Sequence, residues 1–138
     1  QCGCNAVELA LLGSPKVHAH CHCNDCRELL NAPFSPLTAW EDRFVEITKG
    51  EDFLMEFQHP QKQMKRVFCS ECGETLFYTN SLGWRIVPQL LIKKCLGLLP
   101  DEFKSDKHIF YEQRVTDIDD NLPKHLQGSN SPLCFNAQ

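Results

Sequence analysis

The sequence lacks three features that would place the protein in other classes. It has no excess of basic residues, because 18 acidic side chains outnumber 14 lysines and arginines and the formal charge is −4. A general nucleic-acid binder normally carries a basic face, so we expect no nucleic-acid partner. The longest apolar stretch, residues 86–99, is interrupted by proline, lysines and glycine. No run approaches the roughly 20 apolar residues of a membrane helix, so we expect no membrane partner. The sequence also has no internal repeats and no low-complexity block.

What is present indicates one folded domain rich in short strands. The chain has 138 residues, of which 42% are hydrophobic and 23% charged, and these values are ordinary for a globular domain. Alternation of apolar and polar residues predicts strands at 7–11, 16–23, 37–40, 43–48, 53–57, 66–68, 75–78 and 107–115. Asn24 and Asp25 favour a cap for a short helix at residues 26–30. The pattern does not distinguish helix from strand at 84–99. We expect a domain over residues 1–127 and a flexible tail over residues 128–138.

Nine cysteines are the unusual part of the composition. They fall short of the roughly 8–10% typical of a small disulfide scaffold. Seven of them lie in three tight groups, a spacing more typical of metal binding than of scattered disulfides. No secretory signal is visible, and we expect a reducing, cytoplasmic setting. Of the other two cysteines, we expect Cys95 to be a small buried apolar residue and Cys134 to have no role.

Two of the groups together predict a structural zinc site. Cys69 and Cys72 form a CxxC pair followed by Gly73, and the glycine lets the backbone fold so that amide groups face the sulfurs. Such a pair supplies half of a zinc site. Cys2 and Cys4 can complete it, because side chains two residues apart in an extended segment point the same way. Four thiolates close a tetrahedral site with no open position, which is the structural type. Disulfides or an iron–sulfur site would also fit these four cysteines.

The third group, Cys21, Cys23 and Cys26, predicts a site of a different kind. Three thiolate ligands leave the fourth zinc position free for water or for a substrate sulfur. A closed zinc site completed by a histidine or another cysteine, or a redox dithiol, would also fit this spacing. Strand alternation over residues 16–23 places His18, His20 and His22 on the face opposite the cysteines. We interpret His18 and His20 as solvent-facing residues and His22 as a spacer between ligands.

The motifs resemble a known family. The segments CGCNAV, CHCNDCRELLNAPF, RVFCSECGETLF and HIFYEQRVTDIDDNLP are similar to those of the glutathione-dependent formaldehyde-activating enzyme family, which also includes centromere protein V. The resemblance covers about residues 2–124. The family usually has glycine where this chain has Asn5 and Asn31. Asparagine tolerates the left-handed backbone better than most residues, so we expect both turns to be kept.

The resemblance implies a fold, a ligand set and an activity. The fold would be the coiled, β-rich fold shared with Rab-accessory zinc proteins and methionine sulfoxide reductase B. Structural zinc would be bound by four cysteines, and a second, substrate-facing zinc by three: Cys2, Cys4, Cys69 and Cys72, and Cys21, Cys23 and Cys26. The family's founding activity is the addition of glutathione to formaldehyde, formally a carbon–sulfur lyase reaction.

We therefore expect a zinc-dependent enzyme acting on adducts of a small thiol, such as glutathione, with a small aldehyde. Arg27 follows Cys26 directly and would either face a glutathione carboxylate or lie on the helix surface. One alternative is a non-catalytic two-zinc module that carries glutathione or docks to a partner protein. Another is redox chemistry at Cys23 and Cys26.

Overall fold

Short strands carry most of the regular structure of this protein. The computed structural model describes residues 1–134, and in that part of the chain alternating residues form nine strands. Their bounds are β1 Glu8–Leu11, β2 Val17–Cys21, β3 Ser35–Trp40, β4 Val45–Lys49, β5 Leu54–Gln58, β6 Lys65–Cys69, β7 Thr75–Thr79, β8 Arg85–Pro88 and β9 His108–Ile109. The expectation of a mainly β protein is confirmed.

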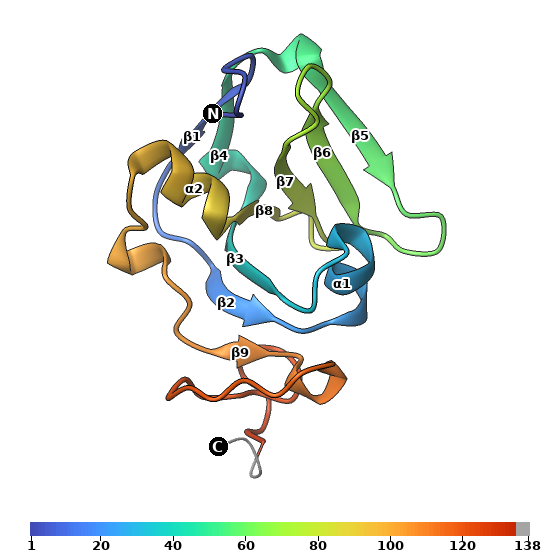
Figure 1. Ribbon diagram of the computed structural model, residues 1–138, viewed down its shortest axis with the longest axis vertical. Coiled ribbons are helices and arrows are strands. Elements are labelled where there is room, and N and C mark those ends of the chain that lie inside the picture. Colours follow the sequence, from blue (N-terminus) through green and yellow to red (C-terminus); the bar gives the residue numbers. More distant parts are fainter. Residues whose placement is uncertain (135–138) are drawn as a thin grey trace.

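The strands form one large sheet and one small one. Seven strands pair in the order β5-β6-β7-β8-β3-β2-β9, and β1 pairs with β4 in a separate antiparallel ribbon. Neighbours in the large sheet are antiparallel, except that β9 runs parallel to β2. Figure 1 shows the short arrows coiling around the centre of the molecule, with the N-terminal segment at the top.

Alternation along the central strands divides the buried side chains between two cores. Phe77 and Val87 belong to one core, and their chain neighbours Tyr78 and Ile86 belong to the other. Successive side chains of a strand point to opposite faces of a sheet. The two cores therefore lie on opposite faces of the large sheet, and each can enclose its own functional group.

Two helices complete the regular structure. Helix α1 spans Asn24–Leu30 and ends at Asn31 in the left-handed conformation, with a φ of 51°. Its cap is Cys23, whose sulfur accepts a hydrogen bond from the Cys26 N–H, so the expected cap at Asn24 and Asp25 is wrong by one residue. Asn5 also has a positive φ, 64°, which confirms the left-handed turns expected at both asparagines.

Helix α2 resolves the segment that the sequence pattern left open. Residues 85–88 continue the large sheet as β8, and α2 then spans Gln89–Leu96 with Pro88 as its N-cap. Gly97 ends the helix in a left-handed conformation. Short 3-10 turns at Asp42–Phe44, Glu51–Phe53, Asp101–Phe103 and Tyr111–Gln113 connect other elements. Among the described residues, no helix has the length and apolar character needed to cross a bilayer.

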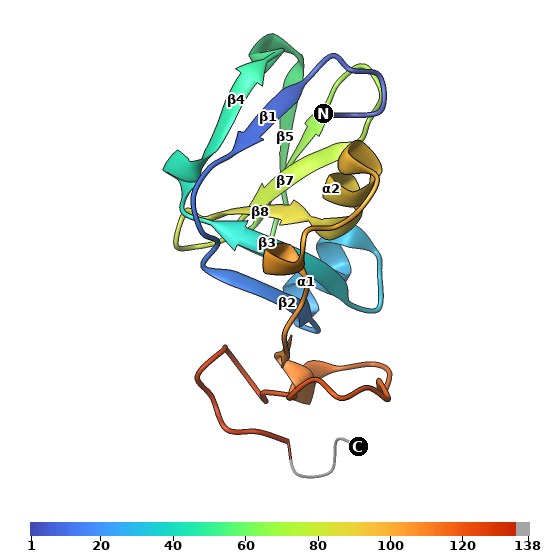
Figure 2. The ribbon, with the colours of Figure 1, turned by 90° about the vertical axis from the view of Figure 1, so that its left-hand side faces the viewer.

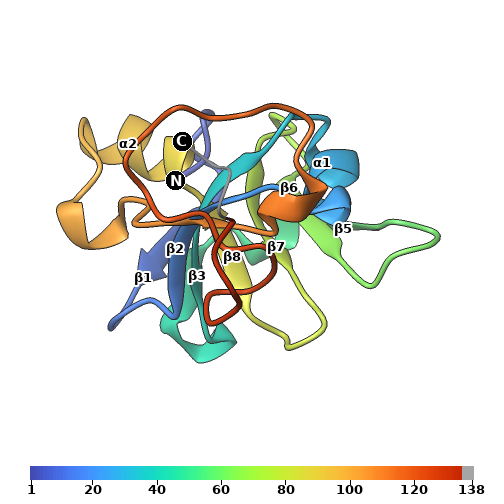
Figure 3. The same cartoon turned by 90° about the horizontal axis from the view of Figure 1, so that it is seen from below.

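The chain after β9 forms a layer at the β9 edge of the large sheet, drawn in orange and red (Figures 1 and 2). Residues 123–127 run beside residues 108–112: the Phe110 N–H donates to the Gln127 carbonyl at 2.7 Å, and the Tyr111 N–H donates to the His125 carbonyl at 3.0 Å. Seen from below, this segment loops across the end of the molecule (Figure 3).

The strand expected at residues 107–115 is much shorter, because β9 ends at Ile109 and a left-handed residue follows it. Residues 128–134 of the expected tail hydrogen-bond back onto the domain. The Cys134 N–H, for example, donates to the Lys124 carbonyl at 2.8 Å. Residues 135–138 of that tail lie outside the described residues.

Candidate metal and substrate sites

The first cysteine group joins the N-terminal turn to the turn between β6 and β7. All four sulfurs lie within 4.8 Å of one another, and they belong to Cys2, Cys4, Cys69 and Cys72. The Cys4 sulfur lies 3.6 Å from that of Cys2 and 3.7 Å from that of Cys69. In a tetrahedral zinc–thiolate centre with bonds of about 2.3 Å, neighbouring sulfurs lie about 3.8 Å apart. The four thiols therefore fit a zinc ion that closes the site.

Local hydrogen bonds bring these thiols together. The Cys2 N–H donates to the Val7 carbonyl at 3.1 Å, and the Gly73 N–H donates to the Cys69 carbonyl at 2.7 Å. Burial opposes ionisation of the Cys2 thiol. The Val7 N–H, 3.3 Å from the sulfur, and the neighbouring thiols outweigh burial and lower the pKa of Cys2 from 9.0 to about 7. Cys2 thus favours the thiolate form near neutral pH, as a zinc ligand requires. For Cys4, a backbone hydrogen bond from Ala6 opposes the shift, but burial and the neighbouring thiols outweigh it and raise the pKa to about 12.

The second group lies in the other core, where β2 leads into α1. Cys21 ends β2, Cys23 caps the helix, and Cys26 occupies its first turn. Their sulfurs also lie within 4.8 Å of one another, and those of Cys21 and Cys26 are 3.6 Å apart. Within residues 1–134, no fourth histidine, cysteine or carboxylate joins this group. The three thiols fit a zinc ion with one protein ligand fewer than the first group supplies.

The pKa values of the three thiols are shifted in opposite directions. Hydrogen bonds from the thiols of Cys21 and Cys26, together with the backbone N–H groups of Cys26 and Asp25, lower the pKa of Cys23 from 9.0 to about 3. The same contacts between sulfurs raise the pKa of Cys21 and Cys26. Cys23 is therefore a thiolate at neutral pH, and it is the least buried of the three.

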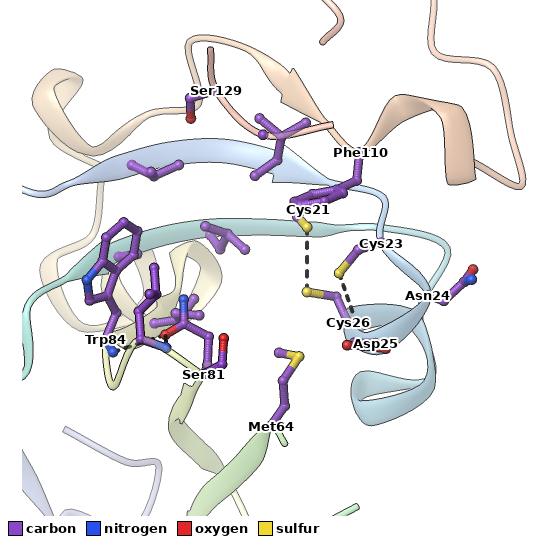
Figure 4. A pocket seen from close by; sticks show the side chains of 18 of the residues that line it. Cys21, Cys23, Asn24, Asp25, Cys26, Met64, Ser81, Trp84, Phe110 and Ser129 are labelled. Carbon is purple, nitrogen blue, oxygen red and sulfur yellow. Dashed lines mark hydrogen bonds between the residues drawn. The ribbon is translucent and has the colours of Figure 1, made fainter. Parts of the chain in front are cut away.

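A cavity of about 1420 Å³ opens onto this second group, and all three cysteines line it (Figure 4). Its other walls come from segments far apart in sequence. Polar side chains that could contact a ligand are Lys16, Asn24, Asp25, Gln61, Lys62, Gln63, Asn80, Ser81, Lys107, Gln113, Ser129 and Asn130. Such a volume holds a ligand much larger than one aldehyde molecule.

Two residues singled out from the sequence lie away from this cavity. Arg27 is not among its lining residues, and its guanidinium donates to the His22 carbonyl at 3.3 Å and to the Asn24 side chain. Cys95 is exposed in the last turn of α2, beyond the part of the helix that packs on the core. The expectation that Cys95 is buried is therefore wrong.

A buried histidine pair behind the second group was missed by the sequence reasoning. His22 and His108 are both fully buried, and their Nε2 and Nδ1 atoms lie 2.8 Å apart. His108 Nε2 donates to the carboxylate of Asp120 at 2.8 Å, since a carboxylate can only accept. Asp120 in turn accepts from the ammonium of Lys124, which is 4% exposed, at 2.7 Å. His22 is not part of the cysteine group, but it belongs to a buried hydrogen-bonded network that the sequence did not predict.

This arrangement fixes the proton positions in the neutral rings. Because His108 Nε2 holds its proton toward Asp120, its Nδ1 accepts from the Nε2–H of His22. The Nδ1 of His22 is then an acceptor, and it has no hydrogen-bond partner among the described residues. Burial lowers the pKa of His22 to about 4, so the ring stays neutral at physiological pH. His20, expected to face solvent, is half-buried, and its ring lies 5.0 Å from that of His108.

Three comparisons place the chain among known proteins. Residues 1–113 match the model of a family described as "Glutathione-dependent formaldehyde-activating enzyme". An uncharacterised lyase of Schizosaccharomyces pombe is 32% identical over 83 residues, which are 59% of this chain, and the chain spans 57% of that relative's length. A crystal structure of a Rhodobacter sphaeroides protein shares the fold with a TM-score of 0.53 at 21% identity, covering 72% of this chain and 95% of the other.

Proposed function

The chain belongs to the glutathione-dependent formaldehyde-activating enzyme family, and from that premise we propose that it handles adducts of a thiol with an aldehyde. The proposed reaction is of the carbon–sulfur lyase type, and the proposed thiol is glutathione. The lyase name of the fission-yeast relative supports this reaction class. The observation that carries the proposal is the group of three thiols at one end of a large cavity.

The contrast between the two cysteine groups supports different roles for them. Four thiols surround the first position, so a metal there has no vacant coordination site and serves the fold. Three thiols surround the second position, which leaves room for the sulfur of a small thiol. A zinc ion held there would lower the pKa of a thiol bound to it, so that the thiol would be a thiolate near neutral pH.

The chain's own residues then orient the reactants. The sulfur of the thiol adds to the carbonyl carbon of the aldehyde, a carbon–sulfur bond forms, and the proton of the thiol ends on the former carbonyl oxygen. Amides and hydroxyls such as Asn24, Gln113 and Ser129 line the cavity and can hold the peptide part of glutathione. Lys62 and Lys107 also line the cavity, but each ammonium already pairs with a carboxylate of the protein at 3.0 Å, so we expect the amides and hydroxyls to supply most of the contacts. The cavity thus contributes proximity and orientation.

A second candidate function has its own support. Asp25 is the only carboxylate among the residues that line the cavity, and no histidine lines it within the described chain. The Asp25 carboxylate pairs with the ammonium of Lys62 at 3.0 Å, so it is not a free general base. A site that carries glutathione without turning it over would need no base. The alternative is therefore a two-zinc binding module.

The test is the rate at which glutathione and formaldehyde exchange with S-hydroxymethylglutathione, measured by exchange NMR on the zinc-loaded full chain. We expect the protein to accelerate exchange above the spontaneous rate. Cys23→Ser should abolish the excess rate, and Cys95→Ser, which alters a thiol outside both groups, should keep it. An excess rate that survives Cys23→Ser would rule out this site. Glutathione binding without acceleration would favour the binding module.

A further inference from the structure

One wall of the cavity is apolar and adjoins the thiols of the second group. Phe110 and Trp84 are partly buried and pack against the core that contains Cys21 and Cys26. In Figure 4 the ring of Phe110 lies beside Cys21, and Trp84 lies on the far side of the cavity. The other apolar side chains that line the cavity are Val17, Leu37, Ala39, Met64, Leu82, Ile86 and Ile109. The cavity therefore has a substantial hydrocarbon surface beside its polar groups, and Phe110 brings that surface next to the thiols.

The backbone of Phe110 is held in an uncommon conformation that places its ring in this wall. Its φ is 53° and its ψ is 36°, values that residues other than glycine and asparagine rarely adopt. Hydrogen bonds fix it on both sides, because its N–H donates to the Gln127 carbonyl at 2.7 Å and its carbonyl accepts from the Gln113 N–H at 3.0 Å. The surrounding structure must hold the backbone in this conformation, so the place of the Phe110 ring in the cavity is fixed by the fold.

The charged side chains of the cavity do not account for its apolar surface. Three lysines line the cavity, Lys16, Lys62 and Lys107, and the ammonium of each lies within 3.1 Å of a carboxylate. None of these three lysines therefore offers an unpaired positive charge to the cavity. A hydroxymethyl group has only two heavy atoms and would leave nearly all of this apolar surface in contact with water.

We propose that the aldehyde handled at this site carries an apolar substituent, an alkyl chain or an aromatic ring, that packs against the wall between Phe110 and Trp84. This inference rests on the proposed function, because it concerns the second reactant at the same thiols. The reaction is the same as with formaldehyde: the thiol sulfur bonds to the carbonyl carbon, and the thiol proton moves to the former carbonyl oxygen. Only the group attached to that carbon differs from the hydrogen of formaldehyde.

The test compares two stable stand-ins for the adduct, S-hexylglutathione and S-methylglutathione, by calorimetric titration of the zinc-loaded full chain. We expect the hexyl compound to bind at least ~10-fold more tightly, because each fully buried methylene contributes roughly fourfold and five are added. Trp84→Ala should bring the two affinities to within about threefold of each other and leave that of S-methylglutathione nearly unchanged. Leu82→Ser, at a lining residue that is 68% exposed and not needed for folding, should reduce the preference as well.

The control is Leu90→Ala, since Leu90 is 65% exposed on α2 and does not line the cavity. It should keep the full preference. Equal affinity for the two compounds, or a preference that survives both Trp84→Ala and Leu82→Ser, would overturn the inference. If the preference is absent but Cys23→Ser still abolishes binding of these compounds, the inference is wrong and the proposed function is supported. If neither compound nor glutathione itself binds, both the inference and the proposed function are wrong.

Discussion

Asp120 links the buried histidine pair to the only deeply buried lysine in the described chain, and its replacement by asparagine should destabilise the fold. Its carboxylate accepts from His108 and from Lys124, and His108 in turn contacts His22, which lies between two cysteines of the second group. The Asn side chain has nearly the same size, so Asp120→Asn removes the charge without opening a cavity. The turn between Cys21 and Cys23 then loses the stabilising contact that reaches His22 through His108 from Asp120, about 100 residues later in the sequence.

The magnitude follows from the ionisation of the carboxyl. Partial burial opposes its ionisation, but the Lys124 ammonium and the His108 ring outweigh burial and lower the pKa of Asp120 from 3.8 to about 2. A difference of about two units corresponds to about 2–3 kcal/mol at neutral pH. Removing one partner of a buried ion pair costs about 3–5 kcal/mol. Because Asp120 is 30% exposed and Lys124 keeps two carbonyl acceptors, we expect a loss of about 2–3 kcal/mol.

The loss of stability caused by Asp120→Asn should become smaller at low pH. The folded pKa lies below the unfolded value, so the stabilisation is fully present above about pH 4 and is lost as the pH falls toward 2. The difference in unfolding free energy between the parent and Asp120→Asn should therefore be equal at pH 7 and pH 5. It should shrink only below about pH 4.

The assay is urea unfolding of the zinc-saturated proteins, with Asp117→Asn as the matched control. Asp117 lies three residues away, is 85% exposed and pairs with Arg114 at the surface, so its loss should cost less than about 1 kcal/mol. A loss below about 0.5 kcal/mol for Asp120→Asn, or one equal to that of the control, would refute the reasoning. In the folded Asp120→Asn protein we also expect weaker zinc binding at the second group and no change at the first.

Two further predictions concern the fold around the first cysteine group. Cys69→Ser should release the metal from that group and lower the melting temperature, because the four thiols close a loop of about 70 residues. A cooperative melt near the parent midpoint with full zinc content would show that the site is not structural. Gly50→Ala should destabilise the protein by several kcal/mol in urea unfolding, since the added Cβ would lie 1.9 Å from the Ala6 carbonyl oxygen. Gly83→Ala has a similar positive φ but open space, so it should cost only about 1–2 kcal/mol, and equal losses would contradict the clash.

The cysteine groups and their turns could be predicted because their signals are local. A CxxC pair followed by glycine specifies a turn within five residues, and Asn5 and Asn31 occupy left-handed positions that few other residues tolerate. The strand alternation also located most of the large sheet. These features depend on backbone sterics and on short spacings, and both are visible in the sequence.

The histidine pair could not be predicted because it depends on a contact between distant segments. Alternation along β2 placed His20 and His22 on the face opposite the cysteines, and a lone strand gives no sign of what covers that face. The covering segment contains His108 and Asp120, about 85 to 100 residues later, and it reaches the pair through a strand of only two residues. The best available signal was the run of three alternating histidines itself, since histidine is intermediate in its tendency to be buried.

The segment at 84–99 was ambiguous for a different reason. It is mostly apolar, and its few polar residues follow neither the strand period nor the helix period. Pro88 divides it, because proline fits the last position of β8 and the N-cap of α2 without needing a backbone N–H. Only the first half of α2 packs against the core, so the last turn of the helix, which contains Cys95, is exposed.

The most direct test of the central claim is native mass spectrometry of the reduced, full-length chain with and without glutathione. We expect two zinc ions per chain and a glutathione adduct in the parent protein. We expect one zinc ion and no adduct in Cys23→Ser, and the parent pattern in Cys95→Ser. A parent protein that holds a single zinc ion and forms no adduct would contradict the assignment of Cys21, Cys23 and Cys26 as an open, thiol-binding metal site.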